Sequence, residues 1–218
     1  MSRDENALHE GIALYYERRL HEHGPTPRGV DWNGAESQQL RFAQLTQILQ
    51  AGPGPDSDRP TTLNDLGCGY GALLDFLVET GWNIDYEGID LSASMVQAAQ
   101  ARHAGVANAR FRVGAACTRM ADYSVASGLF NVRQEVPVPL WEKFIHDTLD
   151  DLDRSSRRGF AFNCLTSYSD AEKMKPHLHY CVPEEIFRHC KTRFSRHVAL
   201  LHDYGLYEFT ILVRKQVG

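Results

Sequence analysis

A run of alternating glycines near residue 67 carries the strongest chemical signal in the chain. Asp65, Gly67, Gly69 and Gly71 follow one another at every second position, directly after apolar residues. Glycine adopts backbone angles closed to other residues and lets a ligand approach the main chain. A helical pattern begins at Gly71, and the N–H groups that open a helix attract carboxylates and phosphates. The pattern therefore predicts a ligand-binding turn between a strand and a helix.

A second carboxylate follows one strand and one helix later. Asp90 ends the apolar segment 83–89, and Ser92 suits the position that caps the next helix. At the tip of a second parallel strand, an aspartate can accept hydrogen bonds from both hydroxyls of a ribose. Asp90 is therefore a candidate for binding a nucleoside.

The glycine spacing alone leaves two kinds of cofactor open. Gly67-x-Gly69-x-x-Ala72 also matches the fingerprint of nicotinamide dinucleotide sites, and Asp90 lies at a suitable distance from it. Asp65 would repel a pyrophosphate and attract a cationic amino group. Helices also precede the first strand, whereas dinucleotide domains usually begin with it. A nicotinamide dehydrogenase is therefore the less favoured alternative.

On these residues the chain resembles the class I S-adenosylmethionine-dependent methyltransferases over residues 60–218. Asp65-x-Gly67-x-Gly69-x-Gly71 is similar to the family's first motif, and Asp90 to its ribose-binding residue. The resemblance implies S-adenosylmethionine as cofactor and S-adenosylhomocysteine as product, with the methionine part at Asp65 and the glycine loop. The cofactor-binding candidates are Asp65, Gly67, Cys68, Gly69, Gly71, Asp90, Leu91, Met95, Ala115 and Ser127.

The chain departs from the family pattern at two places. Residues 114–117 lack the acidic residue that often contacts the adenine amino group, and residues 126–132 lack the Asn/Asp-Pro-Pro-aromatic signature of many N-methyltransferases. The segments 127–131 and 202–210 are also similar to those of a bacterial group of small methyltransferases, a likeness that names no substrate.

The elements that must position these residues alternate along the chain. Apolar spacing predicts helices over 7–23 and 36–50, and the Gly- and Pro-rich residues 52–60 mark a boundary. Alternating strands and helices follow, among them strands over 109–113 and 123–126, and then two strand-like runs joined by a tight turn at 203–205. The expected fold is α/β, a Rossmann-like, doubly wound and mostly parallel seven-stranded sheet with a C-terminal antiparallel hairpin. Residues 1–59 would form an N-terminal helical cap and 60–218 the cofactor-binding domain.

Methyl transfer is an in-line displacement, so alignment and exclusion of water matter more than a dedicated catalytic group. A hydroxyl or ammonium acceptor needs a base with a pKa near neutrality, usually histidine. The catalytic candidates are His179 and His202, in a C-terminal segment rich in histidine. The substrate candidates come from the cap and from loops at the carboxyl ends of strands: Tyr15, Tyr16, Arg19, Trp32, Asn131, Arg133, Tyr168 and Tyr180.

Composition narrows the class of substrate. The 218 residues include 23 Lys and Arg against 28 Asp and Glu, a formal charge of −5, with no dense basic run to bind nucleic acid. No apolar stretch reaches the ~20 residues of a membrane helix, which predicts a cytoplasmic protein without membrane contact. Five irregularly spaced cysteines predict reduced thiols and no metal site.

We therefore expect an enzyme that methylates an oxygen or nitrogen of a small molecule. A nucleotide- or tRNA-directed methyltransferase, and a non-catalytic cofactor-binding sensor or partner subunit, remain alternatives. The sequence leaves the oligomeric state open.

Overall fold

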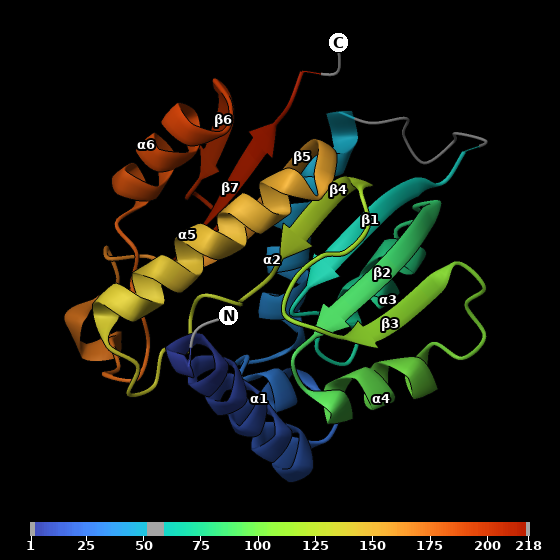
Figure 1. Ribbon diagram of the computed structural model, residues 1–218, viewed down its shortest axis with the longest axis horizontal. Helices are drawn as coiled ribbons and strands as arrows, with labels where there is room; N and C mark the ends of the chain where they lie inside the picture. Colours follow the sequence, from blue (N-terminus) through green and yellow to red (C-terminus); the bar gives the residue numbers. More distant parts are fainter. Residues whose placement is uncertain (1–2, 52–58, 217–218) are drawn as a thin grey trace.

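A seven-stranded sheet forms the centre of the molecule, which the computed structural model describes over residues 3–51 and 59–216 (Figure 1). Its strands are β1 (Thr61–Leu66), β2 (Ile84–Asp90), β3 (Ala109–Val113), β4 (Ala121–Ala126), β5 (Ser156–Leu165), β6 (His197–Leu201) and β7 (Glu208–Arg214). They lie in the order β3-β2-β1-β4-β5-β7-β6, and β1 to β5 run parallel while β7 is antiparallel to both of its neighbours. The expected fold class is confirmed.

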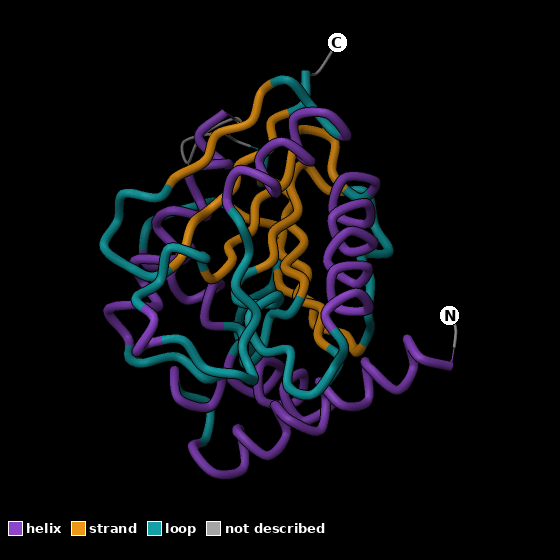
Figure 2. Tube along the Cα trace, turned by 90° about the vertical axis from the view of Figure 1, so that its left-hand side faces the viewer, coloured by secondary structure: helices purple, strands orange, loops and turns teal. Residues whose placement is uncertain are grey.

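Helices cover both faces of the sheet and the carboxyl ends of its parallel strands. They are α1 (Arg3–His23), η1 (Pro27–Val30), α2 (Ala35–Leu45), η2 (Thr46–Ala51), α3 (Ala72–Glu79), α4 (Ala93–Arg102), α5 (Val138–Arg154), η3 (Ala171–Lys173) and α6 (Pro183–Arg193). Apolar side chains of α2, η2 and α3 pack on one face, and those of α5 and α6 pack on the other. Figure 2 shows the helices on either side of the strands and α1 running beneath them.

The two N-terminal helices occupy different places. The arrowheads of β1 to β4 point toward α1, which lies across the carboxyl ends of these strands (Figure 1). Leu8 and Ile12 of α1 reach the core there, whereas Phe42 and Leu45 of α2 belong to the layer on the sheet face. Only α1 thus has the position expected of a cap. The division between residues 59 and 60 stays a prediction, and residues 52–58 of its boundary loop lie outside the described residues.

The C-terminal hairpin has a longer connection than expected. β6 ends at Leu201 and β7 begins at Glu208, so residues 202–207 join the strands and the tight turn predicted at 203–205 is wrong. The Tyr204 hydroxyl lies 3.0 Å from Oγ1 of Thr210, and Thr166 N donates to Tyr207 O at 3.1 Å. Because Tyr204 packs back against β7, the chain needs the additional residues before the strands can pair.

No helix within residues 3–51 and 59–216 is long and apolar enough to cross a membrane. The cytoplasmic location stays a prediction.

Candidate active site

The glycine loop connects β1 to α3 with a backbone that only glycine accommodates easily. Gly67, Gly69 and Gly71 have φ values of 77°, 53° and 84°, in the left-handed region. A Cβ at Gly71 would lie 2.8 Å from Nε2 of His103, whose ring nitrogen is 3.0 Å from Gly71 O. The main-chain N–H of Gly67 donates to Ile89 O at 2.7 Å. The loop is thus fixed against β2 on one side, and its other side lines the pocket.

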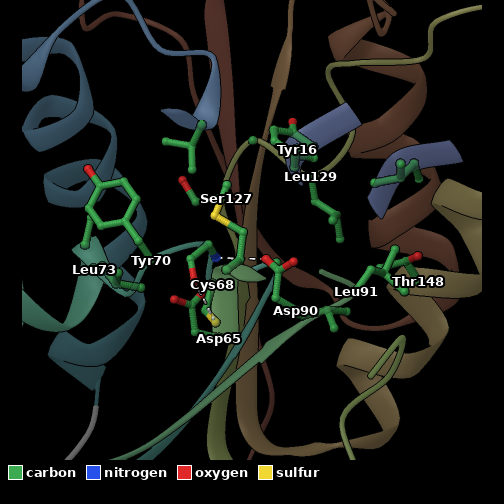
Figure 3. Close-up of a pocket in the computed structure, with 18 of the residues that line it drawn as sticks. Tyr16, Asp65, Cys68, Tyr70, Leu73, Asp90, Leu91, Ser127, Leu129 and Thr148 are labelled. Atoms are coloured by element: carbon green, nitrogen blue, oxygen red, sulfur yellow. Dashed lines mark hydrogen bonds between the residues drawn. The ribbon is translucent and has the colours of Figure 1, made fainter. Parts of the chain in front are cut away.

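Asp90 at the end of β2 is tied to this loop by its own side chain. Its Oδ2 accepts a hydrogen bond from Gly69 N at 2.8 Å (Figure 3), and its Oδ1 accepts one from Ser92 N at 2.9 Å. Burial raises the pKa of Asp90, and the hydrogen bonds from Ser92 and Gly69 oppose that effect. Each oxygen keeps a lone pair, so the carboxylate can accept further hydrogen bonds from a diol. Ser92 also caps α4, as expected, by accepting from Met95 N at 3.2 Å.

Asp65 is an almost fully buried carboxylate with only one satisfied oxygen. It is 2% exposed, and its Oδ2 accepts a hydrogen bond of 2.5 Å from the Tyr86 hydroxyl. Its Oδ1 is buried without a hydrogen-bond partner. Burial raises the pKa of Asp65 to about 7, an effect that the Tyr86 hydrogen bond opposes and the charge of Asp90 reinforces. An unpaired buried carboxylate favours a ligand that brings a cationic amino group to it.

One pocket joins both carboxylates to the underside of α1. Its lining includes His9, Ile12, Tyr16, Val30, Trp32, Gln38, Phe42, Asp65, Leu66, Gly67, Cys68, Gly69, Tyr70, Ala72, Leu73, Asp90, Leu91, Met95, Gly114, Ala115, Ser127, Gly128, Leu129, Phe144 and Thr148. Every predicted cofactor-binding residue except Gly71 belongs to this lining. Gly71 is instead the N-cap residue of α3.

Two of the substrate candidates, Tyr16 and Trp32, also line this pocket. Tyr15 and Arg19 do not, because they hold α1 to the following turn. The Tyr15 hydroxyl donates to Asp31 Oδ2 at 2.8 Å, and Arg19 Nη2 lies 2.9 Å from Asp31 Oδ1. Their contacts therefore fix the end of α1 near the residues of η1.

Asn131 and Arg133 lie outside the pocket lining and stabilise the loops that follow β4 and β5. Asn131 Oδ1 accepts from Leu165 N at 3.2 Å. Arg133 donates through Nη1 to Val136 O at 2.5 Å and through Nη2 to Pro176 O at 3.1 Å. These atoms of Asn131 and Arg133 are therefore hydrogen-bonded within the protein.

The remaining candidates also lie outside the lining. His179 and Tyr180 line a separate hollow between α5 and α6, and the Tyr168 hydroxyl donates to Glu184 Oε1 at 2.5 Å. The His202 ring packs 6.0 Å from the Phe209 ring, centroid to centroid, in an edge-to-face arrangement. The structure does not bring His179 and His202 together with the carboxylates, and their catalytic role stays a prediction.

Several lining residues were not predicted from the sequence. His9 lies at i−3 from Ile12 and i−7 from Tyr16, so the helical spacing of Tyr16 could have identified it. Its Nδ1 is buried without a partner, and burial lowers the pKa of the ring. Gln38 carried no sequence signal; its Oε1 accepts from the Tyr70 hydroxyl at 3.2 Å.

Comparison with known proteins identifies the class. A family model described as a methyltransferase domain matches residues 64–154. The chain is 60% identical over 156 residues to the Mycobacterium tuberculosis protein Rv1506c, named as a candidate methyltransferase; the match covers 72% of this chain and 94% of that one. The chain therefore belongs to the class I S-adenosylmethionine-dependent methyltransferases, and S-adenosylmethionine is its cofactor. This membership excludes the nicotinamide dehydrogenase alternative.

Solved structures share the fold at low sequence identity. Magnesium protoporphyrin IX methyltransferase from Synechocystis, with bound S-adenosylhomocysteine, is 14% identical with a TM-score of 0.67, and the match covers 97% of this chain and 100% of that one. DhpI, in a structure described as the DhpI-SAM-HEP complex, is 16% identical with a TM-score of 0.64, and the match covers 99% of this chain and 100% of that one. These likenesses support the fold.

Proposed function

We propose that this methyltransferase acts on an oxygen or nitrogen of a small, largely apolar molecule. The observation that carries this proposal is the position of α1, which crosses the carboxyl ends of the strands and lines the pocket with His9, Ile12 and Tyr16. A helix in that place leaves room for a small acceptor and obstructs a folded polymer. The relatives named above include magnesium protoporphyrin IX methyltransferase, whose named substrate is a small molecule.

The cofactor would supply an electrophilic methyl group, and residues of the first two strand–helix units, together with Ala115 after β3, would hold it. We place its amino group at the unpartnered Oδ1 of Asp65 and its ribose at Asp90. The backbone of residues 67–71 accommodates the methionine part, and Leu91, Met95 and Ala115 line the adenine slot. The residues present fit the cofactor because Asp65 otherwise buries half of a carboxylate without a partner.

The walls above the cofactor are apolar and aromatic. Phe42, Leu129 and Phe144 line the pocket with Tyr16. No lysine or arginine belongs to the described lining, so the pocket offers no cation to a phosphate or carboxylate. An apolar acceptor that displaces water from such walls gains free energy in proportion to its buried area. This lining favours a small molecule over tRNA as the methyl acceptor.

A hydroxyl or ammonium acceptor must also lose a proton. His9 is well placed for this step because it lines the pocket and its Nδ1 has no hydrogen-bond partner. Burial lowers the pKa of His9, so that the ring is neutral and can accept a proton at neutral pH. We therefore assign the base to His9 in place of His179 and His202.

Incubation with methyl-labelled S-adenosylmethionine tests the proposal. Bacterial metabolite extract and total bacterial tRNA are supplied as acceptors in separate reactions. Label should enter low-molecular-mass products of the extract at a rate well above that of a reaction without protein. The His9→Asn variant should bind S-adenosylhomocysteine as tightly as the wild type and transfer label at least roughly 100-fold more slowly, in keeping with the usual contribution of general base catalysis.

The tRNA reaction and the product analysis give the contrary outcomes. Label recovered in tRNA, with none in the small products, would establish the nucleic-acid alternative. Label that becomes attached to carbon would contradict an oxygen or nitrogen acceptor. Full transfer by His9→Asn would overturn the assignment of the base alone.

A further inference from the structure

A buried ion pair connects α2 to the beginning of β7 behind the pocket. Arg41 donates from Nε to Glu208 Oε2 at 2.7 Å and from Nη2 to Glu208 Oε1 at 2.5 Å. Asn163 of β5 donates from Nδ2 to Glu208 Oε2 at 2.6 Å. Arg41, Asn163 and Glu208 are 8%, 1% and 2% exposed, so the pair is held away from solvent. Two parallel hydrogen bonds from a guanidinium fix the orientation of both groups.

Arg41 and Asn163 each also contact a residue of the pocket wall. The guanidinium carbon of Arg41 lies 4.1 Å from the centroid of the Trp32 ring, in a cation–π arrangement. Gly128 N donates to Asn163 Oδ1 at 2.8 Å. Gly128 also packs on Trp32, because a Cβ at this position would lie 2.8 Å from the ring atom Cζ2. Trp32, Arg41, Glu208, Asn163 and Gly128 therefore form a closed ring of contacts.

Within this contact ring only Trp32 and Gly128 line the pocket. Gly128 follows Ser127 in the loop after β4, and β4 is the neighbour of β1, where Asp65 lies. Asp90 lies on β2, on the other side of β1. The wall that the contact ring holds therefore faces the Asp65 end of the pocket, away from the ribose end. Ser127 Oγ is buried in this wall without a partner.

We infer that Arg41, Asn163 and Glu208 are positioning residues for the methionine part of the cofactor. This inference rests on the placement of the cofactor proposed above. The three residues touch no ligand themselves; they keep Trp32 and the Gly128 backbone in one arrangement. The contact ring also gives a physical role to the two segments singled out in the sequence, 127–131 and 202–210, because Gly128 and Glu208 meet through Asn163.

The effect on binding follows from preorganisation. Each guanidinium nitrogen of Arg41 makes a hydrogen bond, with Nη1 bound to Ser37 O at 3.0 Å and the other two nitrogens to Glu208. The indole ring of Trp32 covers one flat face of the Arg41 guanidinium. A lysine keeps the charge but has no planar fork, so it cannot hold the carboxylate and the indole at once. A wall that moves in the free protein must be ordered on binding, which weakens affinity.

Calorimetric titration of Arg41→Lys with two ligands tests this inference. S-adenosylhomocysteine carries the methionine-derived part, and adenosine lacks it. The variant should bind S-adenosylhomocysteine roughly tenfold more weakly, which corresponds to about 1.4 kcal/mol, and adenosine with less than a twofold change. Tryptophan fluorescence of the free variant should also change, because the cation leaves the face of Trp32.

Arg119→Lys is the matched control. Arg119 also holds a carboxylate and main-chain oxygens, with Nη1 3.0 Å from Asp85 Oδ1 and Nη2 2.9 Å from Leu63 O, but it does not line the pocket. This variant should lose thermal stability and bind both ligands like the wild type. Glu208→Gln provides a second variant of the contact ring if Arg41→Lys does not fold, with the same expectation for the two ligands.

Two outcomes would overturn the inference. One is wild-type affinity of a folded Arg41→Lys or Glu208→Gln variant for S-adenosylhomocysteine. The other is an equal loss of affinity for both ligands, which would mean that the ion pair supports the domain as a whole. Failure of the cofactor placement gives a different result, namely an Asp90→Ala variant that still binds S-adenosylhomocysteine normally.

Discussion

The two halves of the pocket are built in opposite ways. The cofactor half comes from two consecutive strand–helix units, and much of it is main chain: the positive-φ glycines and the N–H of Gly69, held by Asp90. The acceptor half is assembled from side chains of α1, α2, the loop after β4, and α5. Tyr16 and Phe144 both line the pocket although they lie far apart in the chain.

The two halves therefore place different requirements on the sequence. A backbone site depends on glycine at fixed positions and tolerates few substitutions, because the conformation itself is the binding surface. A side-chain site depends on how helices dock, and its residues can change with the acceptor while the fold persists. The cofactor half should therefore fail completely when a single residue is changed, and the acceptor half should fail gradually.

The largest effect is expected for Asp90→Ala. The variant removes the carboxylate that holds Gly69 N and would accept from the ribose, so several charge-assisted hydrogen bonds are lost. At about 1.5 to 3 kcal/mol each, two such bonds correspond to a loss of affinity for S-adenosylhomocysteine of at least roughly 100-fold by calorimetry.

Asp85→Ala is the control on the same strand. Asp85 lies near the start of β2 and pairs with Arg110 and Arg119, at 2.8 and 3.0 Å. Its removal should leave the affinity unchanged and cost on the order of 1 kcal/mol or less, since such partly exposed pairs contribute little. Equal affinity of Asp90→Ala and the wild type would remove the distinction between the two halves.

An intermediate effect is expected at Asp65, as a function of pH. Burial raises the pKa of Asp65 to about 7, so the carboxyl is protonated in acid and ionised above neutrality. Because the ionised form attracts the cofactor's amino group, affinity for S-adenosylhomocysteine should rise with pH up to about 7 and then level off. Below that pKa it should fall by up to about tenfold per pH unit. Asp65→Asn should bind weakly, with no such slope; a flat wild-type profile between pH 5.5 and 8.5 would contradict the assignment.

Asp65 should also make the ligand-free protein less stable as the pH rises. Its folded-state pKa is above that of the unfolded chain, so its contribution to stability is fully present below about pH 4 and lost as the pH rises through about 7. At pH 8 the free energy of unfolding of the Asp65→Asn variant should therefore exceed that of the wild type, by an amount on the order of 2 to 4 kcal/mol, which thermal and denaturant unfolding would measure. At pH 4 the gain should disappear.

The fold could be predicted because its pattern is local. Alternating apolar strands and amphipathic helices determine β1 to β5, and the predicted strand 109–113 coincides with β3. The start of β4 was placed two residues late, at Tyr123, because the register shifts between Ala121 and Tyr123 where β4 meets β5. The turn at 203–205 was wrong because the packing of Tyr204 on Thr210 is a contact that no turn rule contains.

The candidate site divides in the same manner. Asp65, Asp90 and the glycines could be identified since each lies at the end of a strand that the sequence itself marks. His9 was not identified because its importance depends on how α1 crosses the sheet, which residue spacing does not specify. Asn131 and Arg133 were chosen for their place after β4, a rule that finds the correct edge of the sheet but not the direction of a side chain.

The smallest effects are expected for the two histidines of the C-terminal segment. His202→Ala removes an edge-to-face contact with Phe209, which is worth about 0.5 to 1.5 kcal/mol of stability. His179→Ala changes a side chain of the hollow between α5 and α6. Neither ring lines the pocket, so both variants should bind S-adenosylhomocysteine within about twofold of the wild type, well below the tenfold step that 1.4 kcal/mol produces. Calorimetry and thermal unfolding on the same samples separate affinity from stability. Loss of binding in either variant would mean that the C-terminal segment acts on the cofactor, and the pocket would then be one cooperative unit instead of two differently built halves.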